Sequence, residues 1–153
     1  MLIRRIKGNY EMWVRRAMYV VLEVIIADDD SIIAGFLKKV IEEVPDVRVI
    51  AVVNDGKEAV RLVDIHIPDV VFLDIDMPET NGIEAARQMA EIDREIKFVF
   101  VTAHSDFALN AFELYSFDYI MKPFKETRVK TTVRKLKEKF FWNSLLNLSK
   151  LMV

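Results

Sequence analysis

The chain of 153 residues is long enough for one domain with a short extension, because a single fold commonly takes about 100–200 residues. Its 52% hydrophobic and 30% charged residues exclude a disordered tail, and the absence of cysteine excludes disulfides, a thiol nucleophile and cysteine-based metal sites. The net charge is −2, and no stretch approaches the about 20 apolar residues of a membrane span, so we expect a cytoplasmic protein.

Short runs of apolar residues alternate along the chain with longer stretches in which apolar residues recur at helical spacing. Five strands alternating with five helices require crossover connections, which give parallel pairing. The predicted fold is therefore α/β, a flavodoxin-like doubly wound five-stranded parallel sheet of order 2-1-3-4-5. The predicted strands are 20–27, 47–53, 70–73, 97–101 and 117–121. The predicted helices are 31–44, 57–67, 83–92 and 107–115, with a fifth beginning at Phe124.

Polar side chains follow four of these strands at their carboxyl ends, where sheets of this class place their chemistry. Several carboxylates in one pocket repel each other unless a cation is present, and Mg²⁺ takes oxygen ligands of this kind. An aspartate beside such a metal can attack phosphorus, while a hydroxyl and an ammonium bind the phosphoryl oxygens. The pattern therefore indicates aspartyl phosphorylation. The residues concerned are Asp28, Asp29, Asp30, Asp74, Asp76, Thr102 and Lys122, of which Asp30, or Ser31 after it, is expected to cap a helix.

Four segments resemble, in order, the motifs of the receiver domain of two-component response regulators, which are CheY-like proteins. The segments are VIIADDD (24–30), VVFLDIDMPETNG (70–82), VFVTA (99–103) and YIMKPF (119–124). Residues 98–124 are particularly similar to receivers of the LytTR class, whose output domain binds DNA. The resemblance implies a phosphoryl group taken from a sensor histidine kinase and a transcriptional output. It also implies a switch that loses its phosphoryl group by itself rather than an enzyme that turns over a substrate.

Carried over position by position, the resemblance makes Asp74 the phosphoacceptor. It makes Asp28, Asp29 and the backbone carbonyl of Asp76 ligands of Mg²⁺. Lys122 matches the lysine that contacts the phosphoryl group.

Thr102 matches the hydroxyl that binds the phosphoryl group after transfer, and Tyr119 matches an aromatic ring that turns inward with it. Pro123 matches a position that follows a cis peptide bond. Asp76 and His104 each lie two residues beyond a site residue, so we expect them to flank the phosphoryl group and tune its lifetime. The alternative is that they are two exposed loop side chains, and Tyr119 equally fits a packing role.

Two other functions remain open at this stage. A degenerate receiver would fold and bind partners without phosphorylation. A haloacid-dehalogenase-like phosphatase also uses an aspartate nucleophile with Mg²⁺. Its motif requires Thr or Val four residues after the nucleophile, and this sequence has Pro78 at that position after Asp74.

The two ends of the chain differ in charge from its centre. Residues 1–20 carry five basic side chains and one acidic side chain, and residues 122–153 carry nine basic and two acidic side chains. Because the whole chain has a net charge of −2, residues 21–121 have a net charge of −13. We expect 1–19 to be an extension, with Met18 a candidate start, 20–140 the receiver, and 141–153 a helical extension or the beginning of a linker to an output domain.

The expected partners follow from this division. A homodimer would use the face formed by helix 107–115, strand 117–121 and the last helix. DNA contact is expected only through an output domain outside this chain, and no membrane contact is expected.

Overall fold

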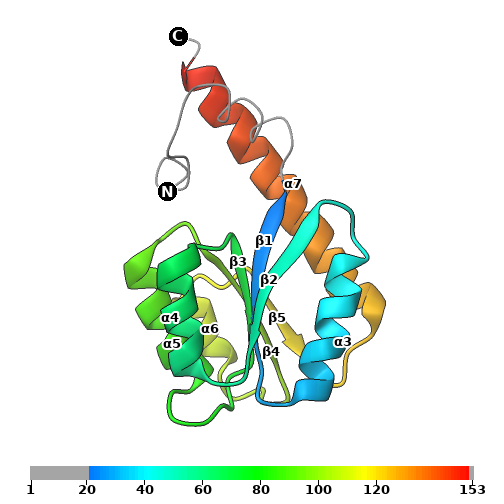
Figure 1. Ribbon diagram of the computed structural model, residues 1–153, viewed down its shortest axis with the longest axis vertical. Coiled ribbons are helices and arrows are strands. Elements are labelled where there is room, and N and C mark those ends of the chain that lie inside the picture. The colour runs from blue at the N-terminus through cyan, green and yellow to red at the C-terminus, as the bar shows by residue number, and fades with distance from the viewer. Residues whose placement is uncertain (1–20, 152–153) are drawn as a thin grey trace.

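A computed structural model describes residues 21–151, which form a parallel sheet with helices on both faces (Figure 1). The strands are β1 (Leu22–Ala27), β2 (Val47–Val53), β3 (Val70–Leu73), β4 (Lys97–Thr102) and β5 (Asp118–Met121). The helices are α3 (Ser31–Glu42), α4 (Gly56–His66), α5 (Gly82–Ile92), α6 (Ala108–Glu113) and α7 (Glu126–Leu151). The strand order β2-β1-β3-β4-β5, with every pair parallel, confirms the predicted flavodoxin-like fold.

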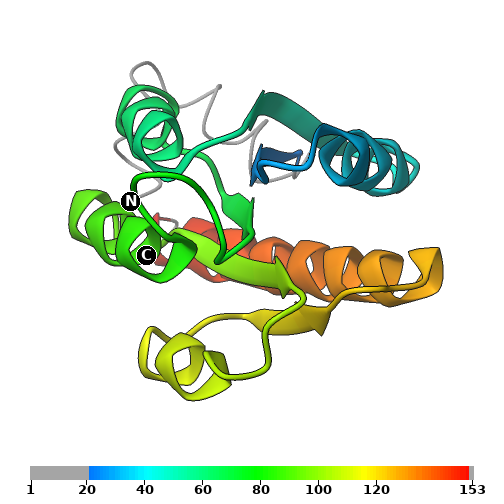
Figure 2. The ribbon, with the colours of Figure 1, turned by 90° about the horizontal axis from the view of Figure 1, so that it is seen from below.

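The two faces of the sheet are covered by different helices, α3 and α7 on one side and α4, α5 and α6 on the other (Figure 2). Alternate residues of β1 show the division, because Val24 and Ile26 pack toward α3 and α7 while Ile25 and Ala27 pack toward the opposite helices. A sheet buried on both faces needs strands that are apolar throughout. This explains why β3, at the centre of the sheet, could be found as a continuous apolar run.

Helix α7 is 26 residues long and extends beyond the end of the sheet (Figure 1). Its first half buries Val129, Val133 and Leu136 in the core. Its second half exposes Phe141, Trp142, Leu145 and Leu146. Within residues 21–151 no helix is both long and apolar enough to cross a bilayer. The predictions for 1–19 and for Met18 concern residues outside the described range.

A side-chain cap begins α3, and a backbone hydrogen bond ends α6. Asp30 caps α3, since its Oδ1 accepts hydrogen bonds from the N–H groups of Ile32 and Ile33 at 3.0 and 3.2 Å. Helix α6 ends at Glu113, earlier than predicted, because Tyr115 adopts a left-handed conformation with φ 54°. The N–H of Ser116 then bonds to the carbonyl of Ala111, which closes the helix.

Candidate phosphoryl-acceptor site

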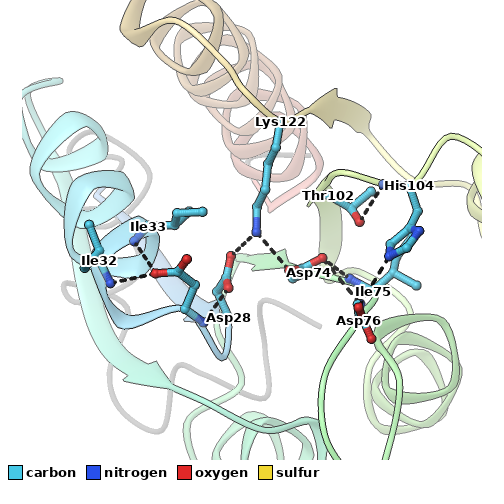
Figure 3. Close-up of polar contacts among 10 residues, drawn as sticks. Asp28, Ile32, Ile33, Asp74, Ile75, Asp76, Thr102, His104 and Lys122 are labelled. Atoms are coloured by element: carbon cyan, nitrogen blue, oxygen red, sulfur yellow. Dashed lines mark hydrogen bonds and ion pairs between the residues drawn. The ribbon is translucent and has the colours of Figure 1, made fainter.

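Lys122 joins two carboxylates at the carboxyl edge of the sheet (Figure 3). Its Nζ lies 2.8 Å from Oδ2 of Asp28 and 2.8 Å from Oδ2 of Asp74. The side chains are 13%, 1% and 8% exposed, respectively, so the contacts are largely shielded from water. Burial acts to lower the pKa of Lys122, but the hydrogen bonds with Asp28 and Asp74 outweigh it and raise the pKa. The ammonium therefore stays charged.

Asp28 and Asp74 form a compact acidic group together with the exposed Asp29. One carboxylate oxygen from each lies within 4.8 Å of the other two. Burial raises the pKa of Asp28 in spite of its bonds to Lys122 and to the N–H of Asp30. Three carboxylates beside one ammonium carry an excess charge that a single divalent cation would offset. Hard oxygen donors in this number suit Mg²⁺.

Asp74 is held by the end of β3 and by the loop that follows it. Its N–H bonds to the carbonyl of Ala27 at 2.9 Å, and its Oδ1 accepts the N–H of Ile75 at 2.7 Å. The beginning of α5 comes so close that a Cβ on Gly82 would lie 2.1 Å from the carbonyl oxygen of Asp74. A Cβ on Gly56, where α4 begins, would meet the carbonyl oxygen of Thr80 at 2.3 Å. Because Gly56 and Gly82 have no side chain, the first residues of α4 and α5 can pack against the loop that follows Asp74.

Thr102 ends β4 and lies next to the strand that carries Asp74. Its side chain is fully buried, and its Oγ1 accepts the N–H of His104 at 3.3 Å. Its carbonyl accepts the N–H of Lys122 at 2.8 Å, which fixes the end of β4 against the residue that follows β5.

His104 and Asp76 contact each other beside Asp74 (Figure 3). The Nε2 of His104 is 3.4 Å from Oδ2 of Asp76, and both side chains are well exposed to solvent. The His104 ring also stands edge-on to Phe107, with centroids 6.2 Å apart. The pair links the loop after β3 to the loop after β4.

Tyr119 lies half-buried against the same region. Its hydroxyl donates to the carbonyl of His104, and its ring is 6.2 Å from that of Phe100. Burial, aided by the charges of Asp106 and Asp74, raises the pKa of Tyr119, so the hydroxyl remains a donor. Two residues beyond β5 stands Pro123, and the peptide bond that joins it to Lys122 is cis.

Comparison with known proteins agrees with this geometry. Residues 24–134 match the family described as the response regulator receiver domain. The chain belongs to this family. Over 117 residues this receiver domain is 35% identical to the sensory transduction protein LytT of Bacillus anthracis and 32% identical to the transcriptional regulatory protein BtsR of Escherichia coli. Each alignment covers 76% of this chain but 48% of the relative, so the chain spans about half the length of these curated relatives.

A solved structure supports the same assignment. The response regulatory domain of mrkE from Klebsiella pneumoniae is 29% identical, with a TM-score of 0.74, and the match covers 78% of this chain and 98% of that domain. Receiver domains are switches rather than turnover enzymes and bind Mg²⁺ in an acidic pocket, and this receiver domain has such an acidic cluster.

The sequence placed the polar residues that follow four strands at one edge of the sheet, and the structure brings Asp28, Asp29, Asp74 and Lys122 together there. It did not reveal that His104 contacts Asp76, or that the Tyr119 hydroxyl reaches the His104 backbone. Nor did it reveal that Gly56 and Gly82 allow close approaches to the backbone of Thr80 and Asp74.

Proposed function

We propose that this receiver domain accepts a phosphoryl group on Asp74 from a phosphohistidine of a sensor histidine kinase. The observation that carries the proposal is the environment of the Asp74 carboxylate, which lies 2.8 Å from the Lys122 ammonium and within one acidic cluster with Asp28 and Asp29. An oxygen of Asp74 attacks phosphorus, the P–N bond breaks, and its electron pair stays on the imidazole nitrogen. The product is an acyl phosphate.

The surrounding groups have separate tasks in this reaction. Asp28, Asp29 and the carbonyl of Asp76 would hold Mg²⁺, which when bound neutralises charge on phosphoryl oxygens. Lys122 exchanges its bond to Asp74 for a bond to a phosphoryl oxygen. Thr102 donates its hydroxyl to another.

Mass spectrometry of the intact protein tests this directly. Incubation with acetyl phosphate and Mg²⁺ should add one phosphoryl group to the wild-type chain and none to Asp74→Asn. No gain in the wild type would instead identify a degenerate receiver that binds partners without phosphorylation. An equal gain in Asp74→Asn would place the acceptor elsewhere.

Asp76 and His104 are the residues that would set the lifetime of the acyl phosphate. Hydrolysis requires water to attack phosphorus and the P–O bond to Asp74 to break, which releases phosphate and restores the carboxylate. His104 and Asp76 contact each other at 3.4 Å, and both side chains are exposed to solvent, so either can orient or exclude the attacking water. Replacing both residues with alanine should change the rate of phosphate loss, and an unchanged rate would refute their role.

The output surface of the switch is proposed to be the face formed by α6, β5 and α7. Phe112 and Tyr115 are 77% and 92% exposed there, and Leu109 and Met121 are exposed beside them, whereas Phe107 and Phe117 pack against the core. Large exposed apolar side chains gathered on one face are typical of protein contact sites.

We expect phosphorylation to cause dimerisation through this face. We also expect a transcriptional output from a part of the protein outside residues 20–140, because the relatives include a transcriptional regulatory protein. Sedimentation with and without beryllofluoride should show a phosphoryl-dependent dimer that Phe112→Ser abolishes. Ile65→Ser, which replaces an exposed apolar residue of α4, serves as the control. Identical sedimentation in both states would refute the dimer.

A further inference from the structure

Asp118, Arg128 and Thr132 form a polar cluster between β5 and the first two turns of α7. We call it the β5 clamp. The Nη1 of Arg128 lies 2.6 Å from one oxygen of Asp118, and Nη2 lies 2.8 Å from the other. The Thr132 hydroxyl, which is 1% exposed, donates to Asp118 and accepts a bond from Arg128 at 2.8 Å. A two-pronged arginine–carboxylate contact with a buried hydroxyl fixes both distance and orientation.

The β5 clamp also occupies the outer side of the strand. β5 is an edge strand that pairs with β4 on one side, and the backbone of Tyr119 bonds to the β5 clamp. The N–H of Tyr119 donates to Asp118 at 2.8 Å, and its carbonyl accepts from Nη2 of Arg128 at 3.4 Å. The strand is therefore hydrogen-bonded on both sides, to β4 on one and to the β5 clamp on the other.

The contacts within the β5 clamp keep Asp118 and Arg128 in their charged forms. Burial acts to raise the pKa of Asp118, but the bonds from Arg128, Thr132 and the Tyr119 N–H outweigh it and lower the pKa. The pKa of Arg128 is raised by the same pair. Both groups are thus charged and matched at neutral pH.

The strand held in this way carries two groups of the phosphoryl site. Tyr119 is in β5, and Lys122 is the first residue after it, with Nζ 2.8 Å from both Asp28 and Asp74. By contrast Asp28, Asp29 and Asp74 follow β1 and β3, which have no contact with the β5 clamp among the hydrogen bonds of residues 21–151. Displacement of β5 would therefore move the lysine without moving the carboxylates.

We propose that Asp118, Arg128 and Thr132 are positioning residues that fix β5 against α7 and so place Lys122 for phosphoryl transfer to Asp74. The inference rests on the proposed function and adds residues to it. These side chains touch neither the carboxylates nor the phosphoryl group, and they act through Lys122. A misplacement of a reacting group by about 1 Å costs up to about 100-fold in rate, so a loosened strand has a measurable effect.

Two matched variants test the inference. Arg128→Met removes the clamp cation, and Lys130→Met removes a neighbouring cation of α7 that pairs with Glu43 at 2.7 Å on the other side of the helix. With acetyl phosphate and Mg²⁺, Arg128→Met should be phosphorylated about tenfold more slowly or worse, while Lys130→Met keeps the wild-type rate. Mg²⁺ affinity, measured by calorimetric titration, should not fall in either variant, because Asp28, Asp29 and Asp74 follow β1 and β3 rather than β5.

Two milder variants keep the test decisive where Arg128→Met does not fold. Arg128→Lys keeps the charge but loses the two-pronged contact, and Thr132→Val removes only the hydroxyl. Each should be phosphorylated measurably more slowly than the wild type and than Lys130→Met, with circular dichroism confirming the fold.

Three results would overturn the inference. The first is a wild-type rate in the folded clamp variants. The second is a loss of Mg²⁺ affinity as large as the loss of rate, which indicates a general disturbance of the site. The third is a wild-type chain that gains no phosphoryl group on Asp74, in which case the proposed function fails and the positioning role fails with it.

Discussion

Replacing Lys122 with methionine removes the ammonium that Asp28 and Asp74 share. The two carboxylates, whose residues are 2% and 6% exposed, would then face each other without that cation. Removing one partner of a buried ion pair commonly costs about 3–5 kcal/mol. Because Lys122 lies at the edge of the sheet with 13% of its side chain exposed, water reduces the effect, and we expect a loss of about 2–4 kcal/mol in the free energy of unfolding in EDTA.

Mg²⁺ should reverse much of this loss. A cation that binds the folded chain and not the unfolded one stabilises it by RT ln(1 + [L]/Kd). In Lys122→Met the ammonium no longer competes for Oδ2 of Asp28 and Asp74, so Mg²⁺ should bind more tightly than in the wild type. Urea unfolding followed by circular dichroism, in EDTA and at saturating Mg²⁺, measures both effects.

Lys130→Met is the control for this experiment as well, since Lys130 pairs with Glu43 at the surface and its loss should change neither curve measurably. The reasoning is wrong if Lys122→Met unfolds within about 0.5 kcal/mol of the wild type in EDTA. It is also wrong if Mg²⁺ stabilises the two proteins equally.

Other substitutions test the packing and the acid response by urea unfolding. Leu136→Ala, in the fully buried part of α7, should cost about 2–5 kcal/mol, while Leu146→Ala on its exposed part should change stability little. Gly82→Ala places a Cβ 2.1 Å from the carbonyl oxygen of Asp74 and should cost about 1–3 kcal/mol, and no loss would mean that the loop can move aside. The pKa of Asp118 in the folded protein is lowered from its ordinary 3.8. The wild type should therefore have a larger free energy of unfolding than Asp118→Asn above pH 3.8, and this difference should disappear as the pH falls through the lower folded pKa. A difference independent of pH between the two proteins would contradict the lowered pKa.

The convergence of Asp74, Thr102 and Lys122 could be predicted from the sequence because it depends only on strand order and direction. In a parallel sheet the carboxyl ends of neighbouring strands meet at one edge, so apolar runs are enough to place the residues that follow them. Capping by Asp30 is equally local, since the side chain bonds to its own helix.

The contacts between loops could not be predicted in the same way. Whether His104 turns toward Asp76 depends on the conformations of two loops that are 28 residues apart in sequence. The Asp118–Arg128 pair depends on how β5 lies against α7. The early end of α6 depends on the left-handed conformation of Tyr115, which the sequence does not indicate because no glycine stands there. These features are set by tertiary packing, which overrides local preference.

Because α7 is long, a small rotation near β5 would displace its far end by a large distance. Its 26 residues span about 39 Å at 1.5 Å per residue, and the β5 clamp grips it within the first seven of them. A rotation of about 5° about the β5 clamp would displace the far end of the helix by about 3 Å. The part that moves furthest is the part that carries Trp142 and Leu146 in contact with solvent. Any rotation of α7 at the β5 clamp would therefore displace the exposed apolar side chains of its second half further than the residues near β5.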